Sequence, residues 1–472
     1  MGAGREGGKI MNRRDFLRLM AGSVAGMALP LGAFELSLAA DGRKPNVIVI
    51  YTDDQGAVDA GCYGTSDIKT PSIDALAESG VRFTQFYSGA PVCSPSRATL
   101  MTGKYPLRAG LAGNVPHVED AEGLPSDQVT IAEMMKRAGY ATAHIGKWHL
   151  GSRAETSPSG QGFDYTFGHL GGCIDNYSHF FYWEGPNRHD LWRNGKEVYY
   201  PGRFFGDLMV EEAGAFLEAN RDKPFFLYFA VNMPHYPYQG DEKWLQEYSG
   251  IEPPRNFYNA FVSTMDERIG RLMSKVDELG LRGNTIVIFQ SDQGHSTEAR
   301  AFYGGGSAGL YRGAKGSLFE GGIRVPAIIS WPDRLPQGAV RNQMVHSADW
   351  MPTIAELCGA DIIDPDIDGK SILPIIENDA AESPHEILFW SYNNSWAVRK
   401  GNWKLLGNPE DTSNKGPLTS DDRLFLVNLS DDVSEMTNIA SQNKKIVSHL
   451  KKEYERWARK VDPGTFYLQH IK

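Results

Sequence analysis

A cysteine, a proline and an arginine stand within five residues, at Cys93, Pro95 and Arg97, with Ser94 and Ser96 between them. Because proline is common in the first turn of a helix, this spacing predicts that Cys93 stands just ahead of a helix N-terminus. Free backbone N–H groups favour anions there, and Arg97 adds a positive charge. A cysteine in this setting is a reactive thiol of low pKa, the precursor of another reactive group, or a buried structural residue.

The residues that follow narrow these alternatives. The segment resembles the signature of the type I sulfatases, a family of the alkaline phosphatase superfamily, in the run Cys93-Ser94-Pro95-Ser96-Arg97-Ala98-Thr99-Leu100-Met101-Thr102-Gly103-Lys104-Tyr105-Pro106. In that family a maturation enzyme oxidises the cysteine to formylglycine (3-oxoalanine), whose hydrate is the nucleophile. The resemblance runs from about Asn46 to the C-terminus, so it implies the same modification at Cys93.

Strands and helices alternate along most of the chain. Continuous apolar runs predict strands buried on both faces, at 46–51, 140–145, 224–231, 285–290 and 325–331. Start and stop signals predict helices at 71–79, 130–138, 256–279 and 348–357. The alternation predicts an α/β fold with a large, mainly parallel or mixed sheet flanked by helices.

Two segments depart from this pattern. Residues 151–203 are rich in aromatic, histidine and glycine residues, and they are either a functional loop near the substrate site or surface hairpins with no direct role. Residues 376–472 predict a smaller C-terminal α+β domain, with antiparallel strands at 396–406 and 423–429 and a terminal helix at 444–461. We therefore expect a catalytic domain over 41–375 followed by this smaller domain.

Polar residues follow or precede the predicted strands at chemically useful positions. Because ligands bind beyond the carboxyl ends of strands in open α/β sheets, we expect these side chains to meet at one edge. They are Asp53 and Asp54, Lys147 and His149, His235, Asp292 and Gln293, and Lys315 in a glycine-rich loop. Taken singly, each is also consistent with a cap, a solvated turn or a structural histidine.

The oxygen donors in this set predict a metal site. Carboxylate and amide oxygens without histidine or cysteine partners suit Ca²⁺ or Mg²⁺ and not Zn²⁺. The sulfatase resemblance implies one Ca²⁺, bound by Asp53, Asp54, Asp292, Gln293 and the residue formed from Cys93. Gln293 departs from the family pattern, in which asparagine or histidine is more frequent.

Three further motifs match the family, and they carry the remaining site residues. They are Gly146-Lys147-Trp148-His149-Leu150-Gly151, Pro234-His235-Tyr236-Pro237 and Gly313-Ala314-Lys315-Gly316. The resemblance implies that Lys147 and Lys315 bind the sulfate oxygens and that His235, with Lys315, protonates the leaving oxygen. It also implies that His149 removes the proton whose loss expels sulfate, while Arg97 holds residue 93 in place.

The first 40 residues resemble a twin-arginine export signal, with Arg13-Arg14 ahead of an apolar run that ends at Ala39-Ala40. A retained membrane anchor is the alternative, but Pro30, Gly32 and Glu35 interrupt the run. We therefore expect the export machinery to deliver a periplasmic or secreted bacterial protein without stable membrane insertion. Removal of the segment takes the net charge from −10 to −12, which argues against nucleic acid as a partner.

The resemblance implies a sulfuric ester hydrolase, and we expect it to release sulfate from a sulfated polysaccharide or oligosaccharide. The carbohydrate preference rests on the aromatic insertion and its arginines Arg188, Arg193 and Arg203. Two alternatives stay open at this point. One is a phosphate or phosphonate monoesterase on the same scaffold, and the other is a non-catalytic carbohydrate-binding homologue. Four cysteines allow at most one disulfide if Cys93 is modified.

Overall fold

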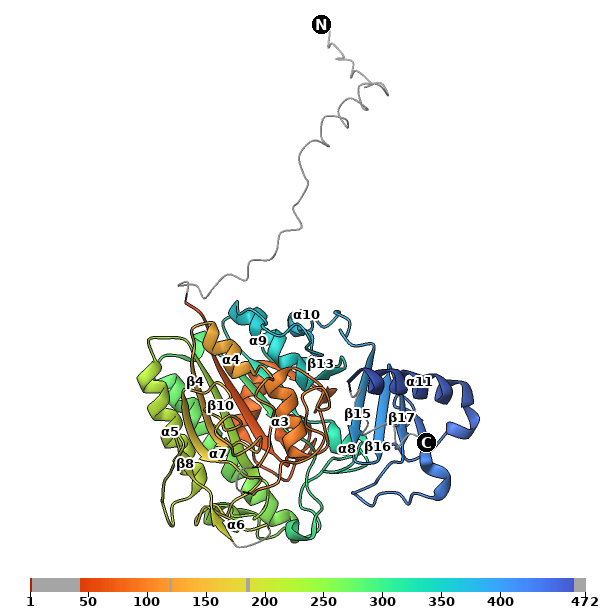
Figure 1. Ribbon diagram of the computed structural model, residues 1–472, viewed down its shortest axis with the longest axis horizontal. Helices are drawn as coiled ribbons and strands as arrows, with labels where there is room; N and C mark the ends of the chain where they lie inside the picture. The colour runs from red at the N-terminus through yellow and green to blue at the C-terminus, as the bar shows by residue number, and fades with distance from the viewer. Residues whose placement is uncertain (2–42, 119–120, 184–186, 462–472) are drawn as a thin grey trace. The chain divides into compact units, whose positions relative to one another are not determined.

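A ten-stranded sheet forms the centre of the protein, in the order β13-β2-β12-β11-β1-β10-β4-β5-β8-β9. The computed structural model describes residues 1, 43–118, 121–183 and 187–461, so the predicted export signal lies outside the described residues apart from Met1. The central strands run parallel to one another: β11 (Thr285–Ser291), β1 (Asn46–Asp53), β10 (Phe225–Pro234), β4 (Ala141–Lys147) and β5 (Tyr165–His169). Figure 1 shows β10 and β4 in the body of the protein beside α3.

Further strands complete the sheet on both sides, and of these β12 and β8 run opposite to the central strands. One side carries β12 (Ala327–Ser330), β2 (Val81–Phe83) and β13 (Ala339–Arg341), and the other carries β8 (Trp192–Arg193) and β9 (Lys196–Glu197). β12 pairs antiparallel with β11. The sheet is therefore mixed but mostly parallel, which confirms the predicted fold class.

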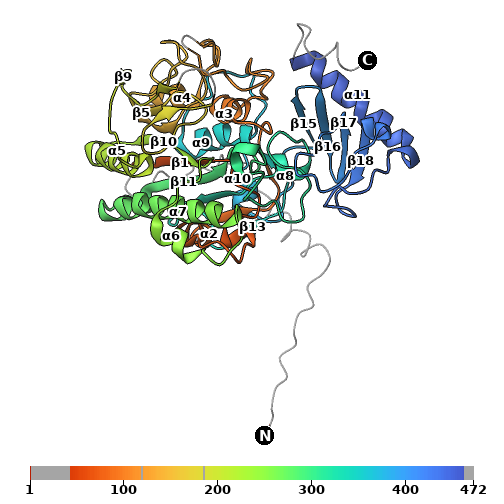
Figure 2. The same ribbon diagram turned by 90° about the horizontal axis from the view of Figure 1, so that it is seen from below.

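Helices cover both faces of the sheet, as Figure 2 shows. The alternation of side chains along β1 explains this, because Val47 and Val49 belong to one buried core and Ile48 and Ile50 to the other. The first core is covered by α3 (Cys93–Thr102), α4 (Ile131–Arg137), α9 (Trp350–Cys358) and α10 (Leu373–Glu377). The second is covered by α2 (Pro71–Glu78), α5 (Phe205–Asn220) and α7 (Arg255–Glu278).

The segment 151–203 is more regular than the sequence suggests. β5, β8 and β9 all come from it and extend the central sheet, while β6 (Phe180–Phe181) and β7 (Arg188–His189) form a small hairpin. These strands are two to five residues long, so they lack the long apolar runs from which the inner strands were predicted. Helix α5 was also not predicted, and Gly206 and Gly214 weaken its helical pattern.

The C-terminal part has the predicted α+β structure. Its antiparallel sheet contains β15 (Ile387–Tyr392), β16 (Ser395–Lys400), β17 (Trp403–Gly407) and β18 (Leu424–Asn428), and α11 (Lys444–Val461) packs on it. Stacked rings join helix and sheet, with ring centroids 4.4 Å apart for Trp396 and Tyr454. The domain boundary after residue 375 stays a prediction. Across the described residues, no helix combines the length and the apolar character that crossing a membrane requires.

Candidate active site

The site residues that the sequence predicted come together at the carboxyl edge of the parallel strands. β1 ends at Asp53, β4 ends at Lys147, and Asp292 and His235 directly follow β11 and β10. Since β12 is antiparallel to β11, the chain ahead of it also arrives at this edge, which brings Lys315 to the same place. All of these side chains are buried except that of Lys315, which is partly buried. Cys93 contacts Asp53, and Lys315 contacts Asp54.

Cys93 is the first residue of α3 and is almost fully buried. Its Sγ lies 3.6 Å from both Asp53 Oδ1 and Gln293 Nε2. Burial raises the pKa of the thiol to about 12, although the charges of Lys147 and Lys315 act in the opposite direction. An unmodified Cys93 is therefore a protonated thiol at neutral pH, which argues against the alternative of a low-pKa nucleophile.

Arg97, one turn along α3, is a fully buried cation. Its Nη2 lies 2.8 Å from Asp292 Oδ2 and 3.6 Å from Asp53 Oδ1, and its Nη1 donates to the Lys147 carbonyl at 3.3 Å. These contacts tie α3 to the ends of β1, β4 and β11. Arg97 therefore ties the start of the helix that carries Cys93 to the strand ends, and it does not itself line the cavity above Cys93.

Two lysines neutralise the first pair of aspartates. Lys147 Nζ lies 2.7 Å from Asp53 Oδ2, and Lys315 Nζ lies 2.9 Å from Asp54 Oδ2. Burial alone would raise the pKa of Asp53, but Lys147, His235 and Arg97 hold it well below its usual range. Both lysine pKa values are raised, because the nearby carboxylates outweigh the burial that lowers them. The site therefore holds ionised groups of both signs at neutral pH.

The same place has the donor atoms for a hard divalent cation. One oxygen each from Asp53 and Asp54 and the Cys93 sulfur lie within 4.8 Å of one another. Gln293 donates through Nε2 to Asp54, while its Oε1 is buried and has no hydrogen-bond partner among the described residues. An orphaned buried oxygen beside carboxylates fits an oxygen-binding cation such as Ca²⁺. Asp292 adds Oδ1, which accepts the Asp54 backbone N–H at 3.1 Å.

Two histidines face the site in defined tautomers. His149 Nε2 lies 3.1 Å from the Val115 carbonyl oxygen, and His235 Nδ1 lies 2.7 Å from that of Tyr236. A carbonyl only accepts, so each of these nitrogens carries a proton. This leaves His149 Nδ1 as a lone pair without a described partner, whereas His235 Nε2 lies 3.7 Å from Asp54 Oδ2. Burial lowers the pKa of both histidines.

A cavity of about 210 Å³ opens above Cys93. His149, His235 and Lys315 line it, as the sequence predicted, and Lys147 lies beneath, fully buried. Sequence reasoning missed several other lining residues: Asn114, His117, Cys173, Phe181, Trp183 and Glu298. They stand in loops or on the short strand β6, so no strand end marks them. All four cysteines are free thiols.

Comparison with known proteins agrees with this geometry. The sulfatase family model matches residues 45–360, and the model described as N-sulphoglucosamine sulphohydrolase, C-terminal, matches residues 306–460. The first match covers the whole catalytic edge and more than half of the chain. The chain therefore belongs to the sulfatase family and is a sulfatase enzyme.

Individual relatives extend over most of the chain. Human arylsulfatase A is 34% identical over 439 residues, which cover 84% of this chain and 83% of the relative. Mouse steryl-sulfatase is 34% identical over 448 residues, covering 77% and 70%. Among solved structures, Ps i-CgsB in complex with k-i-k-neocarrahexaose has a TM-score of 0.80 at 30% identity, covering 90% of this chain and 95% of that one.

Proposed function

We propose that this sulfatase releases sulfate from a sulfated polysaccharide or its oligosaccharides, with formylglycine at position 93 and one bound Ca²⁺. Similarity to a solved structure that is a complex with the oligosaccharide k-i-k-neocarrahexaose supports the carbohydrate substrate. The aromatic and histidine side chains above Cys93 support it as well, because ring faces and a few placed polar groups suit a sugar. The arylsulfatase and steryl-sulfatase relatives make small hydrophobic sulfate esters the main competitor.

The observation that carries the proposal is the pair of lysines that flank Cys93. A sulfate monoester has one negative charge, and its oxygens must be stabilised as the S–O bond to the leaving group breaks. Lys147 pairs with Asp53 and Lys315 pairs with Asp54, so each cation is held in a fixed position. Fixed cations in a site that excludes water stabilise developing charge strongly, because no reorganisation is needed during the reaction.

His235 and His149 are placed to move protons. A sugar alkoxide is a poor leaving group, so the departing oxygen needs a proton from a nearby acid. His235 lines the cavity, and it can donate that proton from Nε2 only in its doubly protonated form, since Nδ1 already donates to the Tyr236 carbonyl. The Asp54 carboxylate 3.7 Å from Nε2 favours this charged form, whereas burial opposes it. His149 lines the same cavity, and its Nδ1 has no hydrogen-bond partner among the described residues, which suits it to take a proton from a hydroxyl at residue 93.

Two groups complete the proposed site when present. Formylglycine would supply a geminal diol at residue 93, and Ca²⁺, held by Asp53, Asp54, Asp292 and Gln293, would polarise oxygen atoms. The orphaned Gln293 Oε1 is consistent with this ligand set. In the protein itself, Arg97 keeps Asp53, Asp292 and α3 together, so that residue 93 stays next to the cation site.

A panel of sulfate esters tests the substrate. We expect the matured enzyme to have a kcat/KM for at least one sulfated oligosaccharide from the carrageenan, chondroitin or heparin series at least about tenfold above that for 4-nitrophenyl sulfate. Sulfate release is measured by ion chromatography. 4-Nitrophenyl phosphate serves as the control, and its hydrolysis should be far slower. Cleavage of the aryl sulfate without cleavage of any sugar would reject the carbohydrate substrate.

Removal of the metal is expected to inactivate the enzyme. Dialysis against EGTA should lower the rate on 4-nitrophenyl sulfate by about 100-fold or more, since a cation that stabilises charge in the transition state is lost. Added Ca²⁺ should restore the rate. Isothermal titration calorimetry should show that Gln293→Ala weakens Ca²⁺ binding, whereas Gln246→Ala, on the surface helix α6 (Glu242–Glu247), does not. A chelated enzyme with full activity would contradict the ligand set.

We also propose that the protein acts outside the cytoplasm of a bacterium, after export and after the action of a formylglycine-generating or sulfatase-maturing enzyme. The export signal in residues 1–40 and the match of Cys93 to the family signature support this.

A further inference from the structure

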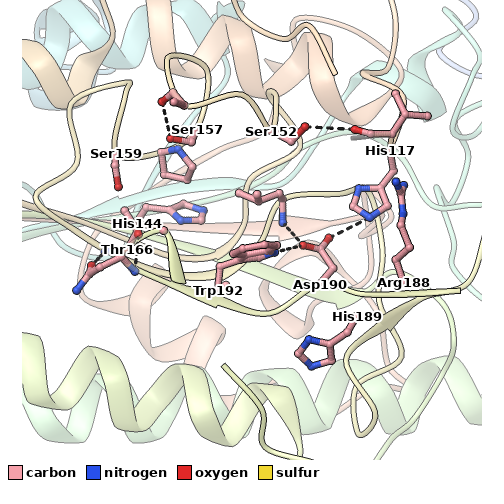
Figure 3. A pocket seen from close by; sticks show the side chains of 17 residues that line it. His117, His144, Ser152, Ser157, Ser159, Thr166, Arg188, His189, Asp190 and Trp192 are labelled. Carbon is pink, nitrogen blue, oxygen red and sulfur yellow. Dashed lines mark hydrogen bonds and ion pairs between the residues drawn. The ribbon is translucent and has the colours of Figure 1, made fainter. Parts of the chain in front are cut away.

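A second, larger cavity lies beside the one above Cys93. Its volume is about 640 Å³, and His117 lines both cavities. Figure 3 shows the second cavity between two walls: a loop that carries Ser152, Ser157 and Ser159, and the strand segment that carries Asp190 and Trp192. His117 and Arg188 stand together at one end, and His144 stands toward the other. Nothing in the mechanism above uses this space.

One wall is held rigidly by Asp190. Its carboxylate accepts the backbone N–H groups of Leu170 and Gly171 at 3.0 and 2.8 Å and the indole N–H of Trp192 at 2.8 Å. The same carboxylate lies 3.4 Å from His117 Nε2. Asp190 is therefore a positioning residue that fixes the Trp192 ring and the shared histidine, and its charge is already satisfied by donors.

Arg188 gives this cavity a positive charge next to the catalytic one. Its guanidinium lies 5.9 Å from the centre of the Phe181 ring, and Phe181 lines the cavity above Cys93. None of the described carboxylates lies within ion-pairing distance of Arg188, whereas Arg193 pairs with Glu212 and Arg203 pairs with Glu211. Among Arg188, Arg193 and Arg203, Arg188 is thus the one that lines a cavity without a described carboxylate partner.

The remaining lining suits hydroxyl groups. His144 is buried, and neither of its ring nitrogens has a hydrogen-bond partner among the described residues. Burial lowers the pKa of His144 to about 3, so it is neutral and offers one donor and one acceptor. Side chains of Ser152, Ser159 and Thr166 add further hydroxyls. A ligand with many hydroxyls and a single anionic group therefore matches the cavity from one end to the other.

The volumes of the two cavities are also consistent with a ligand that has many hydroxyl groups and one anionic group. The space above Cys93, about 210 Å³, is small for more than one sugar ring, while about 640 Å³ is within the usual range of ligand sites. A chain of sugars that passes His117 would place its next residue beside Arg188 and Trp192.

We propose that the second cavity is a subsite for the sugar residue adjacent to the one that loses sulfate, and that Arg188 pairs there with a sulfate or carboxylate group of that residue. This proposal rests on the carbohydrate substrate proposed above. The enzyme then selects oligosaccharides that carry a second anionic group next to the scissile sulfate, because a charge-assisted contact to a planar guanidinium is both strong and directional.

The experiment compares pairs of oligosaccharides that share the scissile sulfate and differ only in an anionic group on the adjacent residue. The pairs come from the carrageenan, chondroitin and heparin series, and 4-nitrophenyl sulfate is the small reference substrate. We expect the wild-type enzyme to prefer the doubly charged member. Arg188→Ala should lower this preference about tenfold, mainly through KM, and Arg188→Lys should restore part of it.

Arg203→Ala is the matched control, because this arginine lies in the same insertion but pairs with Glu211 on the surface. It should change neither the preference nor the aryl sulfate rate. If both oligosaccharides are cleaved and Arg188→Ala leaves their ratio unchanged, the subsite is wrong while the carbohydrate substrate stands. If only 4-nitrophenyl sulfate is cleaved, the proposal of a carbohydrate substrate is rejected, and the proposal of the subsite is rejected with it.

Discussion

Replacement of Cys93 by alanine is expected to abolish sulfate ester hydrolysis, with kcat/KM lowered by about 10⁴-fold or more. Alanine cannot be converted to an aldehyde, so residue 93 would lack the nucleophile, while Lys147, Lys315 and the histidines would remain in place. The side chain is buried but small, so we expect the variant to fold. Rates on 4-nitrophenyl sulfate and circular dichroism spectra would establish both points.

Peptide mass spectrometry links this loss to the proposed modification. Conversion of the cysteine to formylglycine lowers the mass of the peptide by about 18 Da, and the wild-type protein from its native host should show that change at residue 93. Cys62→Ala is the control, since Cys62 lies near Asp74 and outside the cavity above Cys93. It should retain both activity and the mass change. An active native protein with an unmodified Cys93 thiol would contradict the proposed chemistry.

The catalytic edge could be predicted because its residues are attached to long buried strands. β1, β10 and β11 are long, fully buried apolar strands that the sequence pattern identifies directly. A parallel sheet brings their carboxyl ends to one edge, independently of the loops that connect them. Asp53, His235 and Asp292 therefore had to meet. Lys147 and His149 follow the strand predicted at 140–145 and Lys315 precedes the one predicted at 325–331, and the family motifs added their implied roles.

The substrate-facing wall could not be predicted in the same way. His117, Glu298 and Arg188 reach the cavities from loops and a two-residue strand, and their positions depend on contacts between distant segments. His117, for example, is held by Asp190, which is itself fixed by backbone groups of residues 170 and 171. No local sequence pattern predicts such contacts between segments that are distant in the chain. The sequence therefore indicated a carbohydrate only through the composition of the insertion and its arginines, whereas the structure distinguishes Arg188, which lines a cavity, from Arg193 and Arg203.

The sequence also did not indicate what the C-terminal part does for the site. A loop between β17 and β18 supports the loop that carries Lys315. The Ser413 hydroxyl accepts the Gly313 backbone N–H at 3.0 Å, and the Thr412 hydroxyl accepts that of Ala314 at 3.1 Å. Arg312, just before them, pairs with Asp411 at 2.8 Å. The C-terminal part therefore supports the loop of Lys315, the lysine proposed above to bind sulfate.

A buried charge cluster fastens this support to the catalytic part, and its loss should have the largest effect on stability. Lys404 of β17 is fully buried between Glu320 of α8 (Glu320–Ile323) and Glu435, at 3.0 and 2.9 Å. Lys404→Met would leave two carboxylates buried side by side without their shared cation. We expect a loss of about 3–5 kcal/mol in the free energy of unfolding, measured by urea denaturation with tryptophan fluorescence.

Lys400→Met is the matched control for this prediction. Lys400 ends the neighbouring strand β16 and pairs with Glu386, but both side chains are exposed to solvent. Its replacement should cost no more than about 1 kcal/mol, since exposed ion pairs contribute little. Glu320 stands five residues after Lys315, so disruption of the cluster in Lys404→Met should also displace that lysine. We therefore expect this variant to lose sulfatase activity at urea concentrations below its unfolding transition. Equal stability of the two variants would show that the cluster does not hold the C-terminal part in place.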